Sequence, residues 1–202
     1  MPDGLFIVLD GPDGCGKSTQ AARLFKRLSD AGRHVLHLRE PGGTPAGERI
    51  RQILLDPAVT LNTSAETFLF MAARAQLVNE KIHPALAHGD TVVCERWISS
   101  TVAYQGVAGG FGPAAVMDLG RHAIGTLAPD VLFVLDVPPE VGLARVKRGL
   151  DRMELKGLEY HRKVRDGYLA TRTMFPKVEV VDATRQEDAV AADVWACVEK
   201  LL

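Results

Sequence analysis

Short apolar runs recur along the chain, and stretches of helix-forming composition separate them. The first run lies between Gly4 and Asp10 and is too short for a buried helix, so it is typical of a strand buried on both faces. The runs cover residues 5–9, 35–38, 91–94, 131–137 and 178–181. Strands that alternate with helices predict an α/β fold: a doubly wound five-stranded parallel sheet with helices on both faces.

The clearest helix is predicted to begin at Thr63. Thr63 and Glu66 have the spacing of a capping box, and the periodic segment F-L-F-M-A-A-R-A-Q-L-V follows. Pro84 is predicted to mark the last turn or the end of this helix. Residues 106–112 are dense in glycine and residues 145–152 are basic, so both stretches are predicted to be loops.

Composition narrows the class of protein. With 202 residues, 47% of them hydrophobic, we expect residues 1–202 to form a single domain. A net charge of −1 provides no positive field for a nucleic-acid polymer. The three dispersed cysteines argue against a disulfide framework or a zinc site. We see no signal peptide and no membrane span, so we expect a cytoplasmic protein without a membrane partner.

The segment G-P-D-G-C-G-K-S directly follows the first predicted strand and precedes a predicted helix. It fits G-x-x-x-x-G-K-[ST], in which glycines let backbone N–H groups face phosphate oxygens. Lys17 is expected to reach the β- and γ-phosphates of a nucleotide, Ser18 to ligate Mg²⁺, and Cys15 to be a small loop residue rather than a nucleophile. A glycine-rich turn that binds nothing is the alternative. The predicted nucleotide-binding residues are Gly11, Pro12, Asp13, Gly14, Cys15, Gly16, Lys17, Ser18 and Thr19.

The loop alone leaves the class of P-loop NTPase open. A GTPase would need a guanine-reading N-K-x-D motif after a later strand, and the sequence has none. A motor or transporter ATPase would normally bring a larger chain and an apolar partner surface or a membrane segment. The class of P-loop NTPase therefore has to be inferred from the motifs beyond the loop.

Those motifs occur in a fixed order: R-E-P-G-G-T at 39–44, G-E-R-I-R at 47–51, F-x-x-x-R at 70–74, R-x-x-x-S-x-x-A-Y-Q-G at 96–106, L-D-V-P-P-E-V-G-L-A-R at 135–145 and D-R-M-E at 151–154. The combination resembles the bacterial thymidylate kinases over nearly the whole chain. The resemblance implies a nucleoside monophosphate kinase that uses Mg²⁺ and ATP to convert dTMP to dTDP in dTTP biosynthesis. It also implies a homodimer.

The resemblance places an acceptor site on several of these motifs. Phe70 and Arg74 lie four residues apart, so both can serve one planar ligand, the ring by stacking on thymine and the guanidinium by donating to its carbonyl. Core packing of Phe70 and a solvated Arg74 are the alternatives. Arg96 and Arg51 would hold the acceptor phosphate at the carboxyl edge of the sheet, or else form surface salt bridges. The acceptor-binding residues are expected to be Asp13, Glu40, Arg51, Phe70, Arg74, Arg96, Thr101, Tyr104 and Gln105.

Four of these residues have finer roles in relatives. Asp13 would accept from the 3′-hydroxyl of the acceptor, and Tyr104 would crowd the 2′ position of its sugar. Thr101 and Gln105 fall where relatives contact the thymine edge. For Thr101, an ordinary helix N-terminus is the alternative.

The basic stretch resembles the family's lid, expected at about 145–155. In relatives with an arginine in the P-loop, the loop supplies positive charge to the transferred phosphoryl group. Gly14 stands at that position in this chain, so the lid would have to supply the charge, unless the stretch is only a solvated turn. The expected catalytic residues are Lys17, Arg96, Arg148 and Arg152.

Glu95 and Trp97 depart from the D-R-Y or D-R-H pattern of relatives. Ser18 and Glu95 are the expected metal ligands, although glutamate carries its charge one methylene further out than aspartate. Trp97 either reshapes the acceptor pocket or packs. Two other functions stay open: a kinase for another pyrimidine monophosphate, such as dUMP or dCMP, and a catalytically impaired nucleotide-binding regulator.

Overall fold

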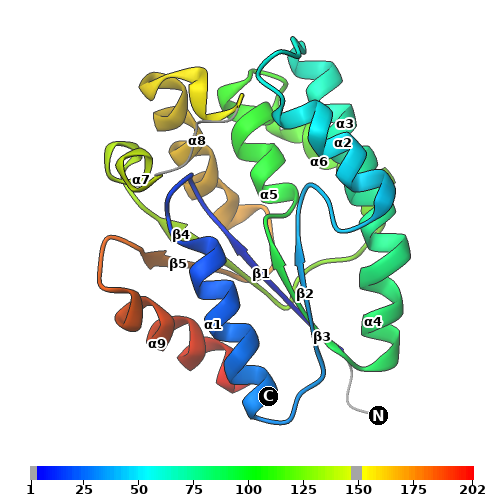
Figure 1. Cartoon of the computed structure of the whole chain (residues 1–202), viewed down its shortest axis with the longest axis vertical. Helices are drawn as coiled ribbons and strands as arrows, with labels where there is room; N and C mark the ends of the chain where they lie inside the picture. The colour runs from blue at the N-terminus through cyan, green and yellow to red at the C-terminus, as the bar shows by residue number, and fades with distance from the viewer. Residues whose placement is uncertain (1–3, 147–151) are drawn as a thin grey trace.

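The computed structural model describes residues 4–146 and 152–202 of the chain, and its strands form one parallel sheet in the order β2-β3-β1-β4-β5 (Figure 1). The described elements are β1 (Leu5–Asp10), α1 (Lys17–Asp30), β2 (Val35–Arg39), α2 (Pro45–Leu55), α3 (Thr63–Leu77), the π-helical η1 (Val78–Ile82), α4 (His83–His88), β3 (Thr91–Glu95), α5 (Ile98–Thr101), the π-helical η2 (Val102–Ala108), α6 (Pro113–Ile124), β4 (Val131–Asp136), α7 (Pro139–Arg145), the 3₁₀-helical η3 (Glu154–Lys156), α8 (Leu158–Ala170), η4 (Thr171–Thr173), β5 (Val178–Asp182), α9 (Glu187–Val198) and η5 (Glu199–Leu201). All five predicted strands are present, and the predicted parallel sheet is confirmed.

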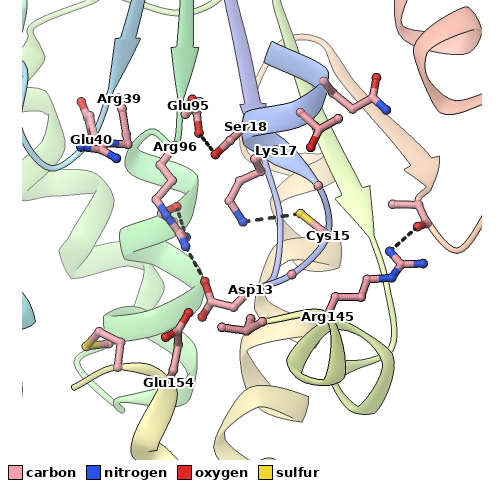
Figure 2. A pocket seen from close by; sticks show the side chains of 18 of the residues that line it. Asp13, Cys15, Lys17, Ser18, Arg39, Glu40, Glu95, Arg96, Arg145 and Glu154 are labelled. Carbon is pink, nitrogen blue, oxygen red and sulfur yellow. Dashed lines mark hydrogen bonds and ion pairs between the residues drawn. The ribbon is translucent and has the colours of Figure 1, made fainter. Parts of the chain in front are cut away.

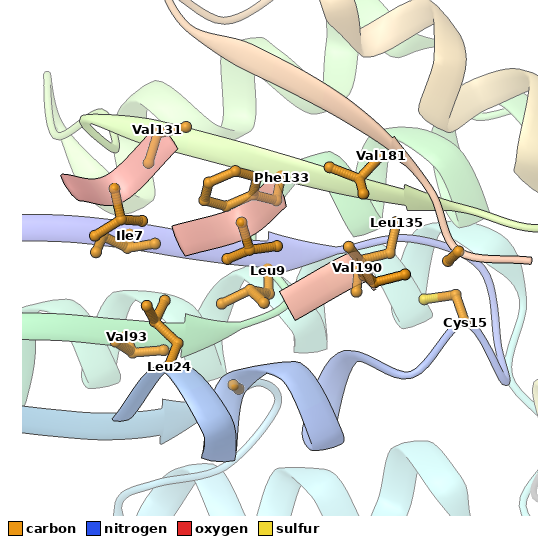
Figure 3. Packing of buried hydrophobic residues seen from close by; sticks show 14 of the residues in the cluster. Ile7, Leu9, Cys15, Leu24, Val93, Val131, Phe133, Leu135, Val181 and Val190 are labelled. Atoms are coloured by element: carbon orange, nitrogen blue, oxygen red, sulfur yellow. The ribbon is translucent and has the colours of Figure 1, made fainter. Parts of the chain in front are cut away.

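Alternate residues of the central strands build a core on each face of the sheet. In β1, Ile7 and Leu9 join a buried cluster with α1 and α9, and Cys15 of the phosphate loop belongs to the same cluster (Figure 3). Phe6 and Val8 face the opposite cluster, which the helices from α3 to α6 cover. The central strands β1, β3 and β4 are therefore buried on both faces, as their apolar sequences predicted, whereas the edge strands β2 and β5 are partly exposed.

The start of α3 corrects the predicted cap. Asn62 is the N-cap, because its side-chain oxygen accepts from the backbone N–H of Ala65 at 2.8 Å. The Thr63 hydroxyl instead donates to the carbonyl of Gly109 at 3.4 Å, and the Glu66 carboxylate accepts from Gln105 rather than from the start of the helix. A tertiary contact thus replaces the capping box.

Pro84 does not end the helical segment. The chain passes from α3 through the π-helical η1 into α4, and Pro84 lies in the first turn of α4. The glycine-dense stretch is also shorter as a loop than predicted, since Gly106 still belongs to η2.

Within residues 4–146 and 152–202, no helix combines the length and the apolar character that crossing a membrane requires. Of the predicted lid, residues 147–151, including Arg148, lie outside the described residues.

Candidate active site

A cavity of about 1060 Å³ lies at the carboxyl edge of the sheet, where the ends of β1, β2 and β3 meet (Figure 2). Open α/β sheets bind their ligands at this edge. The cavity runs from the phosphate loop toward Phe70 of α3 in one direction and toward Thr184 and Gln186 in the other. One continuous space therefore connects the phosphate loop with two separate ends.

The phosphate loop is pressed against α7. Gly14 has a φ of 72°, and a Cβ on it would lie 1.8 Å from the carbonyl oxygen of Gly142. The approach is mutual, because a Cβ on Gly142 would lie 2.2 Å from the carbonyl oxygen of Asp13. No side chain fits at position 14 without displacing α7, which gives a physical reason why the arginine found in some P-loops does not occur here.

Lys17 lies beneath this loop and is buried. Its ammonium donates to the carbonyl oxygens of Gly11 and Pro12 at 2.7 and 2.8 Å, and it lies 3.5 Å from the sulfur of Cys15. Burial raises the pKa of the Cys15 thiol, although Lys17 opposes the shift. Cys15 is therefore a packed thiol, as expected for a small loop residue.

Asp13 and Arg96 form an ion pair inside the cavity. The guanidinium donates to one carboxylate oxygen of Asp13 at 2.5 Å, and the Tyr104 hydroxyl donates to the other at 2.6 Å. Burial raises the pKa of Asp13, but Arg96, Lys17 and the Tyr104 hydrogen bond outweigh it and lower the pKa to about 2. The pair links the phosphate loop to the segment after β3.

Because of this ion pair, the free energy of unfolding of the protein depends on pH. The folded pKa of Asp13 lies below its usual 3.8, so its contribution is complete above about pH 4 and is lost as the pH falls toward 2. We expect wild type to lose about 2 kcal/mol more unfolding free energy than Asp13→Asn over that range, as measured by urea titration. The exposed Asp166→Asn control should follow wild type. Parallel losses in wild type and Asp13→Asn would contradict the assignment.

Asp10 fixes the backbone that carries Arg96, a role that sequence reasoning missed. This fully buried carboxylate accepts from the hydroxyls of Ser99, Ser100 and Tyr168 at 2.6, 2.7 and 2.7 Å. Arg96 itself has a φ of 69°, a left-handed conformation that is rare outside glycine. The only signal in the sequence was a carboxylate at the end of an otherwise apolar strand.

Ser18 and Glu95, the predicted metal ligands, do lie together. The Ser18 hydroxyl donates to one Glu95 oxygen at 2.5 Å (Figure 2). Nε2 of His37 lies 3.0 Å from the other Glu95 oxygen. Burial raises the pKa of Glu95, but the hydrogen bonds from His37 and Ser18 lower it overall. His37 on β2 carried no recognisable signal in the sequence.

Several of the predicted acceptor residues line one end of the cavity: Glu40, Arg51, Phe70, Arg96, Thr101, Tyr104 and Gln105. Trp97 is fully buried and packs edge-on against Phe6, with ring centroids 5.0 Å apart. Of its two possible roles, packing is the one that the structure shows.

Arg74 lies behind this end of the cavity. Its side chain is 1% exposed and contacts Glu40 at 2.6 Å, the Thr101 hydroxyl at 3.1 Å and the Trp97 carbonyl at 3.0 Å. Burial raises the pKa of Glu40 to about 7 although Arg74 opposes the shift. A solvated Arg74 is therefore wrong, and its donation to a thymine carbonyl stays a prediction.

The described lid arginines have partners away from the P-loop. Arg152 pairs with the buried Glu66 at 2.6 Å and donates to the Leu54 carbonyl at 2.8 Å. Arg145 donates to the Ala183 carbonyl at 2.9 Å and lines the cavity. A role for Arg152 at the transferred phosphoryl group stays a prediction.

The end of the cavity near Arg145 was missed by the sequence analysis. It is lined by the segment between β5 and α9 and by the first turns of α9, comprising Ala183, Thr184, Arg185, Gln186, Glu187 and Val190. These residues carry no motif, and only the folding of the chain brings them to the P-loop.

A P-loop between two ends of one cavity, with an ion-paired arginine at its edge, defines a P-loop phosphotransferase of the nucleoside monophosphate kinase type. A sequence model of the thymidylate kinase family matches residues 9–194. The chain is 45% identical to the thymidylate kinase of Deinococcus radiodurans, over 99% of this chain and 98% of the relative. It is 45% identical to that of Thermomicrobium roseum (98% and 95%) and 41% identical to that of Thermosipho africanus (98% and 99%). The chain belongs to the thymidylate kinase family.

Proposed function

We propose that the chain transfers the γ-phosphoryl group of ATP to the 5′-phosphate of dTMP, producing dTDP and ADP. The observation that carries this proposal is the shared cavity, in which the P-loop and Arg96 meet beside Phe70, Thr101 and Gln105. The family's reaction gives each end an occupant, the donor beside Arg145 and the acceptor beside Phe70. Arg96 lies between the acceptor end and the loop.

The reaction mainly requires that the acceptor oxygen be aligned with the γ-phosphoryl group of the donor. A phosphate monoester is already anionic near neutral pH, so the acceptor needs no general base. Arg96 can orient the acceptor oxygen because its planar fork binds two phosphate oxygens at once, and Asp13 holds that fork in place. Lys17 and the loop amides can offset the negative charge of the donor. Closure over the nucleotides would exclude water and limit hydrolysis of ATP.

We also propose Mg²⁺ as the metal. Ser18 and Glu95 offer hard oxygen ligands 2.5 Å apart, and among residues 4–146 and 152–202 no group of three or more metal-binding side chains occurs. That sparse set fits Mg²⁺, which keeps several waters and binds nucleotide phosphates alongside one or two protein oxygens. The ion would neutralise phosphate charge when bound, and Ser18 and Glu95 would hold it.

The proposal is tested by measuring ADP release across a panel of nucleoside monophosphates, with and without Mg²⁺. We expect turnover with dTMP that depends on the metal, weaker turnover with dCMP, and little with CMP or AMP. A preference for CMP or AMP would overturn the acceptor. Binding of ATP and dTMP without turnover would instead favour the impaired regulator.

A homodimer and a cytoplasmic location are proposals as well. Phe68 of α3 is 54% exposed and Ile53 of α2 is 44% exposed, so the adjoining helices α2 and α3 present apolar side chains at the surface. Light scattering coupled to size exclusion should give twice the mass of the chain. A monomer at micromolar concentration would contradict the dimer.

A further inference from the structure

Two polar contacts join α3 to the helical segment α5–η2 at the acceptor end of the cavity. Gln105 Nε2 donates to a Glu66 oxygen at 2.6 Å, and Arg74 Nη1 donates to the Thr101 hydroxyl at 3.1 Å. Glu66, Phe70 and Arg74 follow one another at intervals of four on α3, so they share one face of that helix. Phe70, Thr101 and Gln105 line the cavity, and Phe70 lies one turn from each contact.

The Glu66 carboxylate can act only as an acceptor toward Gln105. Glu66 is 1% exposed and is flanked by Arg152 Nη1 at 2.6 Å and Lys156 Nζ at 3.4 Å. An ionised carboxylate has no hydrogen to donate. Reversing the Gln105 amide would place its carbonyl oxygen against this carboxylate, in a buried place where the repulsion is costly. The amide therefore has one favoured orientation, with Nε2 toward Glu66.

The orientation of an amide decides which pyrimidine it can read. Thymine and uracil carry a hydrogen on N3 and need an acceptor opposite that position, whereas cytosine has a bare N3 and needs a donor. A glutamine that turns freely can satisfy both. With Nε2 held toward Glu66, the carbonyl oxygen of Gln105 is the amide group directed away from that carboxylate, and it is the group that would receive the base edge.

We propose that Glu66 is a specificity-determining positioning residue, which locks the Gln105 amide so that the site favours pyrimidines with a hydrogen on N3 over cytosine. The inference rests on the proposed function, since it takes the acceptor base to lie beside Phe70. Glu66 acts through Gln105 and does not line the cavity wall. The resulting selectivity comes from the unfavourable amide orientation that cytosine would require.

The test is the ratio of kcat/KM for dTMP to that for dCMP in Glu66→Gln. The new amide can donate or accept, so both orientations of Gln105 become possible. We expect the ratio to fall by about tenfold or more. Lys156→Met is the matched control, because it removes a cation from Glu66 and leaves the Gln105 contact in place. Its ratio should stay at the wild-type value.

An unchanged ratio in Glu66→Gln, or an equal loss of both activities, would overturn the proposal, because a merely structural role cannot discriminate between acceptors. Should that variant fail to fold, Gln105→Met supplies the second measurement. It leaves Glu66 paired with Arg152 and Lys156, and we expect the same collapse of the ratio. A wild-type ratio retained in Gln105→Met would overturn the proposal as well.

The measurements on the wild-type enzyme distinguish a failure of this inference from a failure of the proposed function. A wild-type enzyme that prefers dCMP, or phosphorylates neither nucleotide, would overturn both. A wild-type enzyme that prefers dTMP, together with variants that keep the preference, would overturn only the role of Glu66.

Discussion

Arg96→Ala is expected to lower kcat/KM for dTMP by about 10³-fold, in the range found for arginines that stabilise a transferring phosphoryl group. The variant loses the guanidinium that links Asp13 to the acceptor end of the cavity. Arg96→Lys should recover only a small part of the activity, because an ammonium keeps the charge but not the planar fork. Steady-state kinetics with dTMP varied at saturating ATP measure both effects.

A surface arginine supplies the control for this experiment. Arg121 on α6 is exposed, and within the described residues its ion-pair partner is Asp118. Arg121→Ala should therefore keep wild-type kinetics. Urea unfolding of Arg96→Ala must show a folded protein, because Asp13 loses a buried partner in this variant. A folded Arg96→Ala within threefold of wild type would exclude a role for Arg96 in phosphoryl transfer.

Gly142→Ala is expected to lower kcat/KM for ATP by about 10²-fold, although alanine normally favours a helix interior over glycine by about 1 kcal/mol. The added methyl would lie 2.2 Å from the carbonyl oxygen of Asp13, so either α7 or the phosphate loop has to move. A displacement of about 1 Å is enough to misalign the donor phosphates by the expected factor. Kinetics with ATP varied, and calorimetric binding of a non-hydrolysable ATP analogue, measure the loss.

Gly120→Ala is the matched control, since Gly120 is also a buried glycine inside a helix. A Cβ there would meet Cδ1 of Ile98, the end of a side chain that can change its rotamer, rather than a backbone carbonyl. We expect ATP affinity in this variant to stay near the wild-type value. If Gly142→Ala also bound the analogue normally, the contact between α7 and the loop would have no functional importance.

The hydrophobic pattern determined the architecture because a short apolar run by itself indicates a strand of a sheet that helices cover on both faces. The apolar runs appear as β1 to β5, and each strand ends at a polar residue, such as Asp10 and Glu95. The phosphate loop was equally readable, since its chemistry lies within one contiguous segment. Family motifs then placed Phe70, Thr101 and Gln105, which the fold gathers around one cavity.

The local sequence pattern could not show which of several possible hydrogen-bond partners a polar side chain uses. Asn62 and Thr63 are both good helix caps, and the choice fell to Asn62 while the Thr63 hydroxyl contacts Gly109, 46 residues away. Glu66 fitted a capping box equally well, yet its carboxylate is used by Gln105 and Arg152. In each case the alternatives within the segment have similar energies, so a distant contact of about 1 kcal/mol is enough to select one.

The sequence by itself determined the parallel sheet, the phosphate loop and about half of the residues that line the cavity. Only the tertiary structure decided how the buried polar groups pair: Asp10 with the segment after β3, His37 with Glu95, and Glu66 with Gln105. The physical reason is that burial of apolar side chains is non-directional and follows from composition along each element. A hydrogen bond or ion pair instead needs two atoms at a defined distance and angle, and only the folded chain brings them there.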